Sequence, residues 1–97
     1  MRTYKSFWVR QHEVNDHPRH KNGITYSRSP VHAALERVVP GFTDFDEHYI
    51  YVGGLDVNDR KFVTPIRLWR YYRKWFRQEQ VTAHEFRLSP VHEVCLA

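Results

Sequence analysis

Cysteine is almost absent from this chain, and its scarcity excludes several kinds of protein. Cys95 is the only cysteine among the 97 residues. A single cysteine cannot form a disulfide framework within the chain, and it cannot supply the several cysteines of a zinc-ribbon or zinc-finger site. The sequence therefore indicates a fold that is held together by packing, in a compartment that keeps thiols reduced.

Long hydrophobic runs are missing as well. The apolar runs extend over only a few residues, whereas a transmembrane helix needs about 20. The first residues, MRTYKSFWVRQHEV, carry charges where a secretory signal needs an apolar stretch. We therefore expect a soluble, cytoplasmic protein that forms a single domain over residues 1–97, because a chain of this length supports one core.

The common catalytic signatures are also lacking. Gly53-Gly54 is not followed by the lysine and hydroxyl residue of a phosphate-binding loop. No serine has the flanking glycines of a nucleophile elbow, and the lone cysteine lies three residues from the end of the sequence. We therefore predict no catalytic residue and no cofactor, and we expect that the protein is not an enzyme.

Basic and aromatic residues are plentiful. Fifteen lysines and arginines against eleven aspartates and glutamates give a formal net charge of +4, and aromatic residues make up 15% of the chain. A basic balance favours acidic partners without identifying them. The aromatic content supplies large apolar side chains for a small core.

Alternation of apolar and polar residues predicts five strands, at 3–14, 24–27, 48–52, 61–63 and 81–88. Asn22-Gly23 is a strong hairpin dipeptide, and Asn58-Asp59 predicts a turn. The stretch at 41–47 has no clear pattern and is predicted to be a loop. The order of elements favours an α+β fold, with a small, mainly antiparallel sheet.

The tetrapeptide SPVH occurs twice, at residues 29–32 and 89–92. Ser29 suits the N-cap and Pro30 the first position of a helix over about 30–38, which Pro40 then ends. Ser89-Pro90 has the same start chemistry, with room for one or two helical turns. The flanking residues do not match, which favours a shared helix-start pattern over an internal repeat. The alternative is a common role for His32 and His92.

The clearest element is a long amphipathic helix over about 65–78, which packs on one face of the sheet. At about 100° per residue, its cations lie within an arc of roughly 120° and its apolar residues lie within roughly 160° on the other side. The cations are Arg67, Arg70, Arg73, Lys74 and Arg77. The apolar residues are Leu68, Trp69, Tyr71, Tyr72, Trp75 and Phe76. We expect Leu68 and Trp75 to be buried, and Trp69 and Tyr71, at the arc edges, to be partly exposed.

The charge on this helix has two interpretations. Seven basic residues and no acidic one occur between Arg60 and Gln78, and like charges three and four residues apart repel. The cations can pair with the acidic stretch just upstream, which contains Asp44, Asp46, Glu47, Asp56 and Asp59. Alternatively, they form a binding surface for an acidic protein or for nucleic acid, with Trp69 and Tyr71 as further contacts. Arginine outnumbers lysine five to two, which suits bidentate contacts to carboxylate or phosphate.

Histidines and acids gather near the N-terminus. The group contains His12, Glu13, Asp16, His17 and His20. One interpretation is a solvated polar segment whose charge varies with pH, and the other is a site for a divalent metal. The stretch DHPRHKNG also has the histidine and asparagine content of a ββα metal nuclease motif, for which His32 would be the ligand from the following helix. The spacing is not a recognised zinc pattern, so we predict no metal ion as a structural requirement.

The stretch RLWRYYRKWFRQ, together with the lack of a catalytic set, gives the chain its character. The chain resembles the small accessory proteins of tailed phages, and it is similar in length to their inhibitors of the host RecBCD helicase-nuclease. The resemblance implies a protein in the host cytoplasm that binds and modulates a DNA recombination and repair enzyme. Two other hypotheses remain: a module that contacts the phosphate backbone of nucleic acid directly, and a histidine-dependent metal nuclease.

Overall fold

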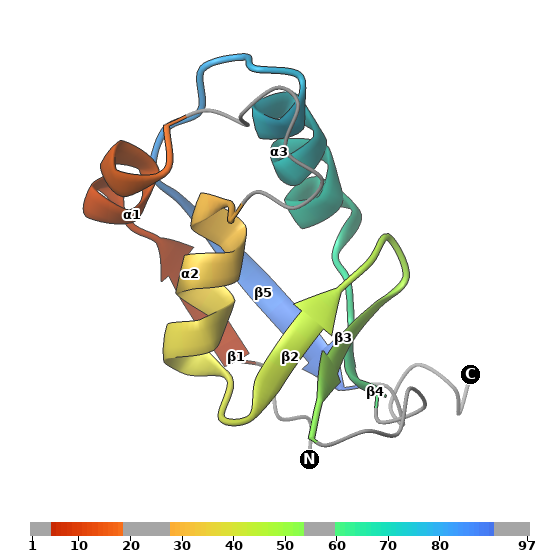
Figure 1. Ribbon diagram of the computed structural model, residues 1–97. Helices are drawn as coiled ribbons and strands as arrows, with labels where there is room; N and C mark the ends of the chain where they lie inside the picture. The colour runs from red at the N-terminus through yellow and green to blue at the C-terminus, as the bar shows by residue number, and fades with distance from the viewer. Residues whose placement is uncertain (1–4, 19–27, 54–59, 91–97) are drawn as a thin grey trace.

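The structure, a computed structural model, describes residues 5–18, 28–53 and 60–90 of the chain (Figure 1). Its helices and strands within these residues are, in order, β1 (Lys5–Val9), α1 (Gln11–Asp16), α2 (Pro30–Val38), β2 (Phe42–Phe45), β3 (Tyr49–Val52), β4 (Arg60–Val63), α3 (Ile66–Phe76) and β5 (His84–Pro90). The α+β class predicted from the sequence is confirmed.

The strands form one curled sheet in the order β1-β5-β4-β3-β2. Every neighbouring pair is antiparallel, so the predicted sheet type is also confirmed. α2 contacts both β1 and β2, although these strands lie at the two ends of the order. One helix reaches both strands because the sheet curls around it, and Figure 1 shows α2 lying between β1 and β2.

Alternation along β1 and β5 assigns one face of this pair to the core. Phe7 and Phe86 are opposite each other in the register, both are buried, and their ring centroids are 5.9 Å apart. Val9 and Leu88 are buried on the same face. The residues between them point the other way and are exposed: Ser6, Trp8, Glu85 and Arg87. The helices therefore cover one face, and the opposite face of β1 and β5 is open to solvent.

The predicted strand over 3–14 is wrong beyond Val9, because α1 begins two residues later. Opposite Val9 lies His84, the first residue of β5, so no partner strand extends further. The carboxylate of Glu13 instead accepts the backbone N–H of Arg10 at 2.9 Å, which caps the first turn of α1. The chain changes from strand to helix after Val9 because its pairing with β5 ends there and because Glu13 caps the helix that follows.

Residues 42–45, predicted to be a loop, form β2. Phe45 is buried and pairs with Ile50 of β3, which is also buried. At the open end of this hairpin, Gly53 donates its N–H to the carbonyl of Gly41 at 3.0 Å. Gly41 has a φ of +76°, a conformation that residues with a side chain rarely adopt. The sequence showed the turn residues but not the pairing between them.

The helix predicted over about 65–78 is shorter, with eleven residues, and Pro65 rather than Thr64 is its N-cap. Thr64 is buried, and its hydroxyl donates to the carbonyl of Asp46 at 2.8 Å. The helix ends before Gln78, whose φ of +65° is left-handed and stops helical hydrogen bonding. The shorter helix predicted over about 30–38 is confirmed as α2.

The two SPVH copies have different structures. Ser29 caps α2 as predicted, because its hydroxyl accepts the backbone N–H of His32 at 3.1 Å. The predicted helix start at Ser89 is wrong, since Ser89 and Pro90 end β5 and are opposite Val63 and Phe62 of β4. Proline is tolerated at such strand ends, where its missing N–H leaves no gap in a ladder. Pairing with β4 therefore overrides the helix-start pattern.

Several predictions lie outside the described residues. They are the hairpin at Asn22-Gly23 with its strand over 24–27, the turn at Asn58-Asp59, and any role of His20, His92 or Cys95. Within the described ranges, no helix is both long enough and apolar enough to cross a membrane.

Trp75 and Leu68 are fully buried, which confirms the sequence prediction for both. We expect Trp75→Ala to lower the free energy of unfolding by about 3–5 kcal/mol, because it leaves a large cavity in the core. Trp75→Phe should lose less, since it keeps most of the apolar surface and removes only the indole N–H bond to the carbonyl of His17.

Urea denaturation of the purified variants measures these differences. Phe76→Ala is the matched control on the next residue, whose side chain is 42% exposed, and it should lose about 1 kcal/mol or less. Equal losses for Trp75→Ala and Phe76→Ala would contradict the packing of α3.

Candidate interaction surface

α3 presents its cations to solvent. All five predicted cations are exposed: Arg67, Arg70, Arg73, Lys74 and Arg77. We call these five residues the cationic stripe. Leu68 and Trp75 are buried on the opposite side of the helix, which fixes the rotation of α3 about its axis. The spacing of three and four residues therefore places the cations side by side on one outward face.

Charge compensation is confined to the C-terminal end of the stripe. Arg77 pairs with Glu79, with 3.0 Å between Nε and Oε2, and the guanidinium of Arg73 lies 6.0 Å from the centroid of the Phe76 ring. Within the described ranges, Arg67, Arg70 and Lys74 have no carboxylate within 4.0 Å. The middle and start of the stripe therefore carry positive charge that the described fold does not neutralise.

The acids that the structure describes upstream of α3 have partners other than the cationic stripe. Asp44 lies 3.4 Å from the Nε2 atom of His32, and Glu47 lies 3.7 Å from His48. Asp46 closes the turn between β2 and β3 through its hydrogen bonds, and Asp56 and Asp59 lie outside the described residues. Among the acids that the structure describes in this stretch, none pairs with the cationic stripe.

Asp46 is a structural turn residue. One carboxylate oxygen accepts the backbone N–H groups of His48 and Tyr49 at 2.7 and 2.8 Å, and the other accepts the hydroxyl of Tyr51 at 2.7 Å. Partial burial raises the pKa of Asp46, but the hydrogen bonds from Tyr51, Tyr49 and His48 outweigh burial and lower it below its ordinary value. Asp46 is therefore held in its charged form by the turn.

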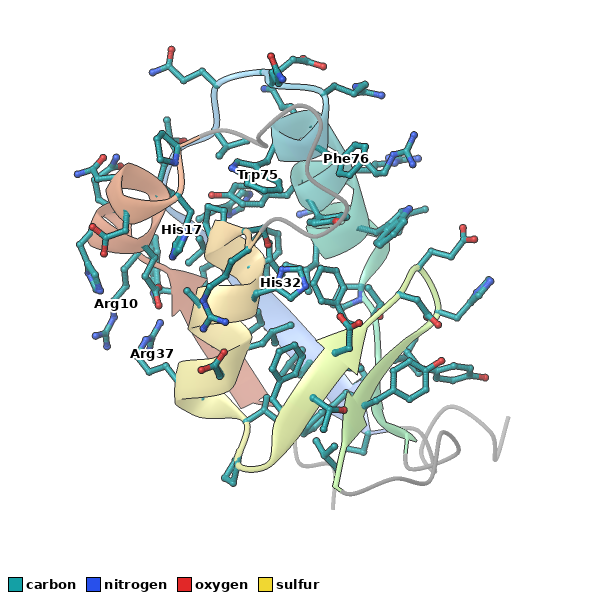
Figure 2. The ribbon with its side chains drawn as sticks, viewed as in Figure 1. Arg10, His17, His32, Arg37, Trp75 and Phe76 are labelled. Atoms are coloured by element: carbon teal, nitrogen blue, oxygen red, sulfur yellow. The ribbon has the colours of Figure 1, made fainter. Side chains whose placement is uncertain are left out.

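Aromatic side chains border the cationic stripe. Trp69 is partly buried, as predicted, and its ring contacts those of Phe45 and Tyr72 with centroids 6.1 and 5.2 Å apart. Phe76 is 42% exposed, and Figure 2 shows it on the opposite side of α3 from Trp75. Trp69 and Phe76 are therefore aromatic residues beside the arginines with surface available to a partner.

Tyr71 was expected to be partly exposed, and this expectation is wrong. Only 9% of Tyr71 is exposed, its ring packs 5.3 Å from that of Phe86, and its hydroxyl donates to the carbonyl of Thr82 at 2.7 Å. Burial, with a smaller contribution from the charge of Glu13, raises the pKa of Tyr71 to about 12. The structure buries the Tyr71 edge of the apolar arc and leaves the other edge, with Trp69 and Phe76, partly or largely exposed, so Tyr71 is a core residue.

Sequence reasoning missed the exposure of Phe76 and of Ile66, which is 64% exposed. A signal existed for Ile66, because it precedes Arg67 by one residue and so lies, at about 100° per residue, within the cationic arc. No comparable signal existed for Phe76. The neighbouring strand determines which edge of the apolar arc is buried. The sequence of the helix alone does not show where that strand lies.

His32 forms a buried hydrogen-bonded network at the start of α2. Its Nδ1 atom lies 2.7 Å from the hydroxyl of Ser29 and 3.3 Å from the Ser29 backbone nitrogen, which donates to it. The Nε2 atom faces Asp44, and the rings of Phe45 and Tyr72 pack around the imidazole with centroids 4.9 and 5.9 Å away. Because Nδ1 accepts a hydrogen bond, neutral His32 carries its proton on Nε2, toward Asp44.

This network contains the residue types of a serine hydrolase triad but does not have its geometry. Ser29 is completely buried, and its hydroxyl accepts a backbone N–H of α2. A nucleophile must reach a substrate, and here the hydroxyl faces the helix that it caps. Aromatic rings also enclose His32, which was the ligand considered for a metal nuclease. The arrangement fits a helix cap that joins α2 to β2.

The histidine cluster is divided among different roles. Glu13 is buried and accepts two hydrogen bonds from Arg37 at 3.2 and 3.3 Å, in addition to the N–H of Arg10. The carbonyl of His17 accepts the indole N–H of Trp75 at 2.7 Å, and Figure 2 labels the two residues, at the end of α1 and on α3. His12 and Asp16 are exposed on α1. The described residues contain no group of three histidine, cysteine or acidic side chains placed to hold a metal ion.

Comparison with protein-family models, with curated proteins and with solved structures finds no match to this chain.

Acidification is expected to destabilise the fold through His32. Burial lowers the pKa of His32 below its ordinary value of 6.5, although the charge of Asp44 acts in the opposite direction. The folded chain therefore binds this proton less readily than the unfolded chain. The stability that neutral His32 contributes is complete above about pH 6.5, and it is lost as the pH falls through the folded-state pKa.

Urea midpoints measured between about pH 7.5 and pH 5 check this expectation. The midpoint should fall more steeply for the parent than for His32→Gln, which cannot take up the proton. All other side chains are the same in both proteins, so the comparison isolates the effect of His32. Parallel pH profiles would show that His32 does not couple stability to pH.

Removal of metal ions is expected to leave the thermal stability unchanged. A metal ion that supported folding would contribute about 10–16 kcal/mol, and its removal would lower the melting temperature by many degrees. Melts of the purified protein with and without a chelator make the measurement, with added zinc as the control. A large drop that zinc reverses would contradict this expectation.

Proposed function

We propose that the protein is a non-enzymatic binding protein that modulates or inhibits a nucleic-acid-processing enzyme through the cationic stripe and the bordering aromatics. The observation that supports the proposal is the uncompensated charge of Arg67, Arg70 and Lys74. As the resemblance to phage inhibitors implies, the partner is a host DNA recombination and repair nuclease in the host cytoplasm.

The composition of this surface favours a protein partner. Repulsion between cations three and four residues apart costs a few tenths of a kcal/mol for each pair, and a bound acidic surface relieves it. Arginine and large aromatic side chains are the residues that most often dominate binding energy at protein interfaces. Arg73 with Phe76, and Trp69 with Arg70, combine these two residue types on one exposed face.

Acidic side chains beside the stripe also favour a protein over nucleic acid. Trp69 contacts Phe45, and Phe45 lies between Asp44 and Asp46 on the chain. Asp44 keeps 63% of its side chain exposed. Carboxylates near the aromatic border repel a phosphate backbone, whereas a protein partner with charges of both signs can match them.

Direct binding to the phosphate backbone is the second candidate. It is favoured by the regular spacing of the stripe, because Arg67, Arg70 and Lys74 can each meet a phosphate without competition from a described carboxylate. The two candidates differ in their dependence on salt. Phosphate binding weakens linearly on a log-log salt plot, with a slope of about 0.9 for each contact to duplex DNA, whereas an aromatic protein interface weakens much less.

A charge-reversal variant tests the proposal. We expect Arg70→Glu with Lys74→Glu to melt at a temperature close to that of the parent, because both side chains are exposed and lack described ion pairs. The same variant should lose binding to the protein that the parent captures from nuclease-treated bacterial lysate. His12→Glu with Asn15→Glu, which adds two carboxylates to exposed positions of α1, is the matched control and should bind as the parent does.

Each outcome distinguishes between interpretations. Capture that disappears after nuclease treatment favours the nucleic-acid candidate. Undiminished binding by the double variant makes the stripe a solvated helix face and overturns the proposal. Unfolding of the variant would restore the view that these cations pair with acids of the chain itself.

A further inference from the structure

A groove of about 460 Å³ lies at the start of α3, beside the β1–β5 pair. Its polar lining consists of Arg67 from α3, Glu85 and Arg87 from β5, and Ser6 from β1. Its apolar lining comes from Pro65, Ile66 and Phe86. The groove therefore joins the N-terminal end of the cationic stripe to the sheet.

The groove follows from the way β4 leaves the sheet. Within the described residues, β4 pairs with β5 at Val63–Ser89 and Phe62–Pro90. The chain then turns at Thr64 and Pro65 into α3, whose Tyr71 packs against Phe86 of β5. A helix packs farther from a strand than a hydrogen-bonded neighbouring strand does. The groove is the space between the first turn of α3 and β5.

Ile66 is the most exposed large apolar side chain among the residues that the structure describes. It is 64% exposed, more than Trp8 or Phe76, and it lies next to Phe86, which forms part of the lining and is itself buried. Covering a side chain such as isoleucine removes apolar surface from water and stabilises a complex. A partner that places an apolar side chain in the groove would gain this contribution.

The charges around Ile66 specify what accompanies that apolar side chain. The described lining contains two arginines, Arg67 and Arg87, and one acid, Glu85, so its formal charges sum to a net positive value. Arg67 also belongs to the cationic stripe, which makes the groove and the stripe one continuous surface. Arginine pairs with carboxylates through two parallel hydrogen bonds, which favours an acidic ligand.

We infer that this groove takes an acidic segment of the partner protein, with an apolar side chain against Ile66 and carboxylates against Arg67 and Arg87. The inference rests on the proposed function, because it names the part of the partner that reaches beyond the stripe. The carboxylate of Glu85 repels acidic side chains and accepts backbone N–H groups. It therefore restricts the orientation in which the segment can bind.

Nuclear magnetic resonance with a defined peptide tests the inference. The probe is a pentapeptide, blocked at both ends, with a central leucine between two pairs of aspartates. We expect its addition to shift the backbone amide signals of Ile66 and Arg67 and those of residues 85–87. A control peptide with alanine in place of leucine should bind about tenfold more weakly. A second control, with asparagines in place of the aspartates, should lose a similar factor.

Substitutions in the groove give opposite effects that a merely structural change would not produce. Arg87→Gln should weaken binding of the leucine peptide about tenfold, because it removes a charge-assisted contact. Glu85→Gln, on the same strand and also exposed, should tighten binding about twofold or more, because it removes a repulsive charge. Both variants should melt close to the parent, and Arg67→Gln provides a second neutralisation if Arg87→Gln unfolds.

The outcomes separate this inference from the proposed function. Signal shifts confined to the amides of Arg70, Arg73 and Arg77 would contradict binding in the groove and would leave the cationic stripe as the binding surface. Equal binding of the leucine and alanine peptides, or weaker binding by Glu85→Gln, would also overturn it. Failure of the proposed function is detected independently, by undiminished lysate capture with Arg70→Glu and Lys74→Glu.

Discussion

The burial of Trp75 determines the orientation of α3, and the character of the surface depends on that orientation. The indole ring is fully buried and stacks on Tyr72 with centroids 6.0 Å apart. Its N–H donates to the carbonyl of His17, which comes from the end of α1 and is far away in sequence. A helix pinned at one position by both packing and a hydrogen bond cannot rotate about its axis. The five cations are therefore held outward as a group.

A buried ion pair has a comparable role on the other side of the molecule. Glu13 is almost fully buried, and a buried carboxylate is strongly destabilising unless its oxygens are paired. Arg37 of α2 supplies a bidentate partner and also donates to the carbonyl of Trp8. One guanidinium thereby joins β1, α1 and α2. Among the described residues, no buried polar side-chain atom lacks a hydrogen-bond partner.

The sequence was informative where local chemistry determines structure, and less so where distant residues do. The Ser29 cap, the span of α2 and the burial of Leu68 and Trp75 follow from patterns within about one helical turn. The strand at 42–45 and the end of β1 at Val9 depend on which strand lies opposite, and alternation within a segment does not show that.

The candidate site divides in the same way. Helical spacing alone placed the five cations on one face, and all of them are exposed. The burial of Tyr71 against Phe86 and the groove beside Ile66 arise because β5 returns next to the start of α3. The residues that meet are 15 positions apart for Tyr71 and Phe86 and 20 for Ile66 and Phe86, so no local pattern in either segment indicates the contact.

The pairing of β1 with β5 also has a consequence for how the chain folds. Phe7 lies opposite Phe86, so the first described strand finds its partner only in the last one. Contacts between residues so far apart in sequence close a long loop, and proteins rich in them fold slowly. During synthesis, β1 must wait for nearly all of the described chain to leave the ribosome before its ladder can form. Until then its apolar face, with Phe7 and Val9, is available to chaperones and to aggregation.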